Sequence, residues 1–188
     1  MSLQTVWSAQ RLLWRSKADA ADSELDKPTA YKARRRDGYI LIDIFLALEG
    51  TWLLDRTIPG HAKLQGVATF KRVDDCSLKY EETGDLELLG GKKLSATRSY
   101  VYRLAEPFIE IEFSGRQYDS GTPLFAKLEL DNSCEGKSTI PYKHYCGKDV
   151  YELIFRFEMP RSFSSEISVF GPKKDYVTYS RYFRRSDD

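Results

Sequence analysis

Three stretches of the sequence carry polar or aromatic side chains at every second residue. In an extended strand, a spacing of two puts side chains on the same face of the sheet. These stretches supply a carboxylate, a guanidinium, an imidazole, a thiol and several phenols, at Tyr80 and Glu82, at Arg98, Tyr100 and Tyr102, and at Tyr142, His144 and Cys146. Aromatic walls with a few converging polar groups are typical of small-molecule pockets. We therefore predict that these residues bind a hydrophobic or aromatic small molecule, with Arg98 meeting an anionic group where the ligand carries one.

The same groups could also catalyse a reaction. A histidine accepts and donates protons near neutral pH, so His144 is the first acid–base candidate and Glu82 the second. Together they would suit a cofactor-free isomerase or cyclase. The structural alternative is that Glu82 and Arg98 form an ion pair across neighbouring strands, while the tyrosines and His144 serve packing. The residues are thus compatible with a binder, an enzyme, or an assembly protein with a filled interior.

Charge and motifs exclude several classes of function. The 29 basic and 28 acidic residues give a formal net charge of +1, which argues against a nucleic-acid partner. The sequence has no GxGxxG, P-loop, HExxH or GxSxG motif, and its cysteines form no C-x-x-C pair. We therefore expect neither a cofactor nor a metal. No apolar run approaches the roughly 18–20 residues of a transmembrane helix.

The cysteines and the N-terminus bear on location. Cys76, Cys134 and Cys146 are odd in number, and no secretory signal opens the chain, so we expect a cytoplasmic protein with free thiols. The first eighteen residues contain basic residues and no acid, which is also the composition of a mitochondrial transit peptide. We predict that residues 3–15 form a helix, with Trp7 and Trp14 on it, packed on the domain.

From residue 51 onward, hydrophobic and polar residues alternate in many short runs separated by turn signals such as Gly90-Gly91 and Gly147-Lys148. This pattern predicts an antiparallel up-and-down meander, which loses its exposed edges when it closes into a barrel. A helical stripe of apolar residues precedes it within 38–50. We expect residues 1–37 to comprise the N-terminal helix and a polar linker, and residues 38–188 to form a mainly β domain, a barrel with helices only on its N-terminal side.

The stretch "LEGTW" joins the expected helix to the first strand. A helix followed by Gly-x-Trp at the start of a meander resembles the calycins, the group of the lipocalins. In that group the tryptophan plugs the closed end of the barrel and an arginine of the last strand stacks over the indole. The resemblance therefore implies that Trp52 is the plug and that Arg181 or Arg184 is its partner.

A closer resemblance covers residues 48–184. The pieces "GTWLLDRTIPG", "GVATF", "YEETG", "RSYVY", "HYCGKDVY" and "GPKKDYVTYSRYFR" are similar to a family of small proteins known only as a domain of unknown function. This resemblance implies a calycin-like barrel and no particular activity. The sequence before residue 38 lies outside it.

Overall fold

The computed structural model describes residues 41–114, 124–131, 133 and 137–185. Within them the chain forms one helix and ten strands. The elements are α1 (Leu41–Leu48), β1 (Gly50–Ile58), β2 (Ala62–Asp74), β3 (Ser77–Leu88), β4 (Lys93–Ala105), β5 (Phe108–Phe113), β6 (Leu124–Leu128), β7 (Tyr142–Cys146), β8 (Asp149–Glu158), β9 (Ser162–Gly171) and β10 (Lys174–Arg184). The expected helix at 3–15 and the expected linker, residues 19–37, lie outside the described residues.

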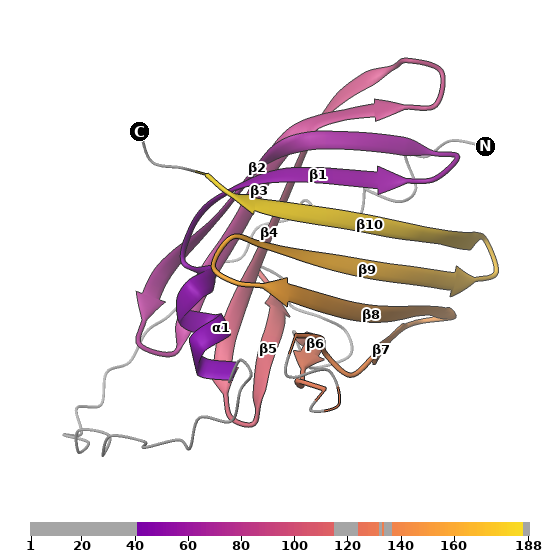
Figure 1. The fold of residues 1–188 in the computed structure, drawn as a ribbon. Helices are drawn as coiled ribbons and strands as arrows, with labels where there is room; N and C mark the ends of the chain where they lie inside the picture. Colours follow the sequence, from indigo (N-terminus) through magenta and orange to yellow (C-terminus); the bar gives the residue numbers. More distant parts are fainter. Residues whose placement is uncertain (1–40, 115–123, 132, 134–136, 186–188) are drawn as a thin grey trace, which may run out of the picture. The chain divides into compact units, whose positions relative to one another are not determined.

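All ten strands form one antiparallel sheet in the order β6-β5-β4-β3-β2-β1-β10-β9-β8-β7. Sequential strands are neighbours, and the last strand returns to pair with the first, from Trp52↔Arg184 to Thr57↔Tyr179. The two edge strands approach each other at an isolated bridge between Leu130 and Thr139. The predicted up-and-down β-barrel is thereby confirmed, with a nearly closed wall (Figure 1).

Period-two alternation decides which side chains face inward. Along β1, Trp52, Leu54 and Arg56 are buried, whereas the residues between them are exposed. Most of the inward positions carry large apolar or aromatic side chains, which pack into one core. The described part of the chain contains no helix with the length and apolarity needed to cross a membrane.

Trp52, which lies near the start of β1 beside α1, has a fully buried side chain, as expected of a plug at the closed end of the barrel. Its Nε1 donates a hydrogen bond of 2.8 Å to the carbonyl oxygen of Leu48 at the end of α1. The guanidinium carbon of Arg184 lies 4.0 Å from the centroid of the Trp52 ring system, within cation–π range. Arg181, the other candidate for this contact, is exposed.

Arg184 also ties α1 to the last strand. Its guanidinium donates hydrogen bonds to the carbonyl oxygens of Ala47 and Glu49, which the helix leaves without partners at its C-terminus. Gly50 follows with a φ of 128°, a value that L side chains rarely adopt, and a Cβ there would clash with the Arg184 guanidinium. The Gly-x-Trp triplet therefore sets the geometry of the closed end.

Candidate functional site

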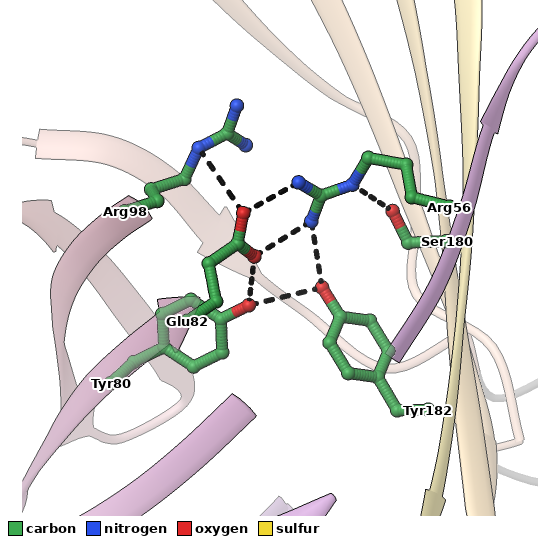
Figure 2. A network of polar contacts seen from close by, with 6 residues as sticks. All are labelled: Arg56, Tyr80, Glu82, Arg98, Ser180 and Tyr182. Atoms are coloured by element: carbon green, nitrogen blue, oxygen red, sulfur yellow. Dashed lines mark hydrogen bonds and ion pairs between the residues drawn. The ribbon is translucent and has the colours of Figure 1, made fainter. Parts of the chain in front are cut away.

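A polar cluster lies inside the barrel, built on Glu82 of β3. Figure 2 shows its carboxylate between the guanidinium groups of Arg56 and Arg98, with the hydroxyl groups of Tyr80 and Tyr182 beside it. The side chain of Glu82 is only 3% exposed. β1, β3, β4 and β10 each contribute inward-facing residues to this cluster, because these strands lie close together in the sheet order.

Arg56 is held on three sides. Its two terminal nitrogens donate to the two carboxylate oxygens of Glu82 at 2.6 and 2.8 Å, a bidentate pair. Its Nε donates to Ser180 Oγ at 2.8 Å, and the Tyr182 hydroxyl lies 3.3 Å from Nη2. Arg56 is 6% exposed, so this guanidinium is fixed in the interior.

The tyrosines complete the hydrogen bonding around the carboxylate. The Tyr80 hydroxyl donates to Glu82 Oε2, and the hydroxyls of Tyr80 and Tyr182 are 3.3 Å apart. Tyr100 and Tyr102 are buried on the same face of β4 as Arg98, and both rings pack near Tyr80. The polar cluster is therefore a hydrogen-bonded network surrounded by aromatic side chains.

Arg98 differs from Arg56 in its exposure. Its Nε is 3.8 Å from Glu82 Oε1, and its side chain is 27% exposed. The two residues are direct partners in the β3–β4 register, so the ion pair that we considered as the structural alternative is present. The Arg98 guanidinium lies 5.9 Å from the centroid of the Tyr100 ring.

Electrostatics gives the cluster a net positive charge. Burial would raise the pKa of Glu82, but the nearby charge and hydrogen bonds of Arg56, with Arg98, lower it to about 2. Burial raises the pKa of Tyr80 and of Tyr102 well above the ordinary value, so both stay neutral. At neutral pH, two guanidinium groups and one carboxylate leave one positive charge on these three side chains.

A small cavity adjoins this network. The volume that the centre of a water molecule can occupy is about 20 Å³, so the cavity has room for roughly one water. Its walls combine the cluster with apolar and hydroxyl side chains, namely Arg56, Tyr80, Glu82, Arg98, Tyr100, Tyr102, Ile111, Phe125, Phe155, Ser165, Ile167 and Tyr182. The cavity is thus much narrower than a ready-made pocket for a drug-sized ligand.

The third predicted stretch lies apart from the cluster. Tyr142 and His144 are half-buried on β7, and His144 packs against the rings of Phe113, Phe125 and Tyr151. Cys146 is exposed at the end of β7. None of the three β7 residues lines the cavity described above. The sequence-predicted site is therefore divided: the β3 and β4 residues come together, and the β7 residues do not join them.

This separation bears on acid–base chemistry. Glu82 is ionised and held by Arg56, so it is poorly suited to carry a proton near pH 7. Burial lowers the pKa of His144, and the structure records no contact between His144 and Glu82 in the part of the chain it describes.

Arg56, Ser180 and Tyr182 are the cluster residues that sequence reasoning missed. The signal was present: Arg56 follows Trp52 and Leu54 at a spacing of two, and Ser180 and Tyr182 alternate along "TYSRY". Next to Asp55 in "LLDRTIPG", Arg56 is easily taken for a solvated surface residue, whereas its spacing of four residues from Trp52 puts it on the same face of the strand.

The described residues contain no group of three or more histidine, cysteine, aspartate or glutamate side chains placed to hold a metal ion. The polar centre of this barrel is instead built on arginine, glutamate and tyrosine.

Solved structures with a similar fold include an S-type phycobiliprotein lyase, CPES, from Guillardia theta. It has a TM-score of 0.57 at 9% identity, covering 80% of this chain and 95% of that chain. A de novo designed fluorescence-activating β-barrel has a TM-score of 0.42 at 10% identity, covering 77% of this chain and 100% of that chain. The redesigned barrel mFAP1, bound to DFHBI, gives 0.39 at 11% identity, covering 74% of this chain and 96% of that chain. Of these three, the lyase supports the barrel fold.

Comparison with the curated proteins finds no match. The family model described as a family of unknown function (DUF6314) matches residues 48–184, which is most of the chain. The chain belongs to this family, and the match spans β1 to β10, the whole barrel wall.

Proposed function

We propose that this DUF6314 protein binds a hydrophobic or aromatic small molecule with an anionic group inside its barrel. The observation that carries the proposal is the cluster of the buried Arg56 and Glu82 with the half-buried Arg98, beside a cavity with aromatic walls. Family membership adds no activity, because the family's function is unknown.

Stability alone is a weak reason for such a cluster. Replacing a buried ion pair by well-packed hydrophobic residues is often neutral or stabilising, so a barrel that serves only as a scaffold gains little from it. Here the cluster also holds two guanidinium groups for one carboxylate. The half-buried guanidinium of Arg98 lines the cavity, where it could meet an anionic group of a ligand.

The two arginines would have different roles. Arg56 is held by Glu82 and Ser180 and positions the carboxylate. Arg98 lines the cavity, keeps part of its side chain accessible, and lies near the Tyr100 ring. We therefore assign to Arg98 the contact with the anionic group of the ligand.

The aromatic wall suggests the shape of the ligand. The rings of Tyr100 and Phe125 are nearly parallel, 7° apart in orientation with centroids 5.5 Å apart, and both line the cavity. A planar body could lie against such a surface. Because the cavity has room for roughly one water, a ring-sized ligand must displace part of the wall as it binds.

We also propose the cytoplasm as the site of action. Cys76 and Cys146 are free and exposed, which suits a reducing compartment. A mitochondrial location depends on residues 1–18, which lie outside the described residues.

Two dyes that differ in one anionic group test the proposal. 1-Anilinonaphthalene-8-sulfonate and the uncharged N-phenyl-1-naphthylamine share their aromatic body and can be titrated by fluorescence. We expect Arg98→Met to weaken binding of the sulfonate by about tenfold or more, the scale of a charge-assisted contact, with little effect on the uncharged dye.

The matched control is Arg103→Met. Arg103 lies on the same strand, but its exposed side chain pairs with Glu112. This variant should bind both dyes as the wild type does, and a thermal melt should show that both variants remain folded. Equal affinity of Arg98→Met and wild type for the sulfonate would refute the role of Arg98. Failure of both dyes to bind the folded wild type would refute the binding site itself.

A further inference from the structure

The barrel wall is weakest between its two edge strands. Along the rest of the sheet order, neighbouring strands are joined by antiparallel ladders. Between β6 and β7, the described residues form only the isolated bridge Leu130↔Thr139, which lies beyond the end of β6 and before the start of β7. Two backbone hydrogen bonds of 2.8 Å flank it, from Asp131 to Ser138 and from Ile140 to Glu129. We call this joint the β6–β7 seam (Figure 1).

Beyond the bridge, side chains close the seam in place of a ladder. Phe125 of β6 contacts His144 of β7, with ring centroids 5.4 Å apart, and Tyr151 of β8 at 6.5 Å. Phe113 of β5 lies 5.9 Å from His144. Opening the seam breaks these ring contacts, of about 0.5–1.5 kcal/mol each, together with the bridge at Leu130 and Thr139, but no strand ladder among the described residues.

Phe125 connects the seam to the candidate site. Its ring stacks on Tyr100 and lines the cavity, while its other contacts reach across the seam to His144. An outward movement of Phe125 would therefore join the cavity to the outside. It would also enlarge the space beside Arg98, which a ring-sized ligand requires.

The other walls are held more firmly. Trp52, Arg184 and α1 close one end. Toward the opposite end, Lys174 at the start of β10 forms an ion pair of 2.6 Å with Asp149 at the start of β8 and donates to the Tyr151 hydroxyl. These contacts tie the strand ends of two successive hairpins together.

We propose that the ligand enters and leaves the barrel sideways through the β6–β7 seam, with Phe125 as the wall residue that moves. This inference rests on the proposed function, because it assigns the route to that site. The ligand class is unchanged: a planar aromatic anion small enough to pass between two strands.

A reversible disulfide across the seam tests the route. Leu130 and Thr139 form a non-hydrogen-bonded pair, since the flanking bonds join their neighbours, and such pairs have Cα atoms about 4.5 Å apart. That spacing suits a disulfide. The seam staple is Leu130→Cys with Thr139→Cys, in the full-length chain with Cys76, Cys134 and Cys146 replaced by serine.

A control staple has the same pairing geometry elsewhere. Ser162 of β9 pairs with Phe183 of β10. The backbone hydrogen bond from Arg184 N to Arg161 O joins their neighbours, so Ser162 and Phe183 are also a non-hydrogen-bonded pair. A full ladder already joins these strands, so Ser162→Cys with Phe183→Cys should leave ligand exchange unchanged.

Stopped-flow fluorescence with 1-anilinonaphthalene-8-sulfonate supplies the measurement. We expect the oxidised seam staple to slow both association and dissociation by about tenfold or more, as for binding limited by a conformational change, and dithiothreitol to restore both rates. The oxidised control staple should exchange dye at the rate of its reduced form. Equal rates for the oxidised and reduced seam staple would overturn the proposal.

Hydrogen exchange of the wild type gives an independent test that requires neither a ligand nor a variant. The amides of Asp131 and Ile140 should exchange at least about a hundredfold faster than hydrogen-bonded amides of the β1–β2 ladder, because local opening precedes global unfolding. Equal protection would overturn the seam proposal even if the dye binds. Loss of dye binding with fast exchange at the seam would instead refute the proposed function and leave the weak seam established.

Discussion

The closed end of the barrel and its interior cluster use arginine in contrasting ways. At the closed end, Arg184 stacks on Trp52 and donates to carbonyl oxygens at the end of α1. In the interior, Arg56 and Arg98 flank one carboxylate beside a cavity. An arginine that binds backbone and a ring secures the fold. Arginines beside an accessible cavity would provide the binding surface that we propose.

The largest effect that separates the two regions should come from Trp52→Ala. Removing this fully buried side chain leaves a cavity under α1, and we expect the free energy of unfolding to fall by about 3–5 kcal/mol. Urea denaturation measures the change. Leu53→Ala is the control, because Leu53 is the next residue along β1 but is 48% exposed, and it should change stability by less than about 1 kcal/mol. A loss below about 1 kcal/mol for Trp52→Ala would show that the plug is dispensable.

Glu82→Gln should come next. The variant leaves the buried guanidinium of Arg56 without its carboxylate, and breaking a buried pair in this way costs about 3 kcal/mol or more. Glu112→Gln breaks the more exposed pair with Arg103 and should cost less than about 1 kcal/mol. Equal losses of unfolding free energy in the two variants would show that the interior ion pair contributes no more to stability than the exposed one.

Acid should remove the contribution of Glu82. Its pKa of about 2 in the folded state lies below the ordinary 4.5, so its stabilisation is present above pH 4.5 and is lost as the pH falls toward 2. That difference corresponds to about 3 kcal/mol. The difference in unfolding free energy between wild type and Glu82→Gln, measured by denaturant titration at several pH values, should shrink across this window. A constant difference would contradict the lowered pKa.

Alternation grouped the side chains that share a strand face, although it did not tell which faces point into the barrel. The inward face of β3 and β4 includes Tyr80, Glu82, Arg98 and Tyr100. The pairing of the two strands has no bulge, so every second residue stays on the same face. The same rule would have placed Arg56 inside beside Trp52. It was missed because Arg56 stands beside Asp55, and the local sequence gives no sign that its ion-pair partner lies on another strand.

Alternation could not predict which strands would lie side by side around the barrel. The β7 residues share a face just as the β4 residues do. Among the described strands, however, β7 forms a ladder only with β8 and lies at the edge of the sheet. Strand order depends on long-range pairing and on where the barrel closes, neither of which a local pattern contains. His144 and Cys146 were therefore grouped with a cluster from which the topology separates them.

The smallest predicted effect on stability concerns His144, which lies at the β6–β7 seam. Burial among Phe113, Phe125 and Tyr151 lowers its pKa below the ordinary 6.5. The unfolded chain therefore binds the proton more readily, and stability should decline as the pH falls from above 6.5 toward the folded-state pKa. Because the side chain is only half-buried, this decline should be smaller than the effects of the Trp52 and Glu82 variants. His144→Gln should remove it, whereas replacing the exposed His61 by Gln should retain it. Urea denaturation between about pH 8 and 5, a range that spans the ordinary histidine pKa, measures this effect. Equal pH dependence of stability in wild type and His144→Gln would show that the aromatic contacts at the seam tolerate the charged imidazole.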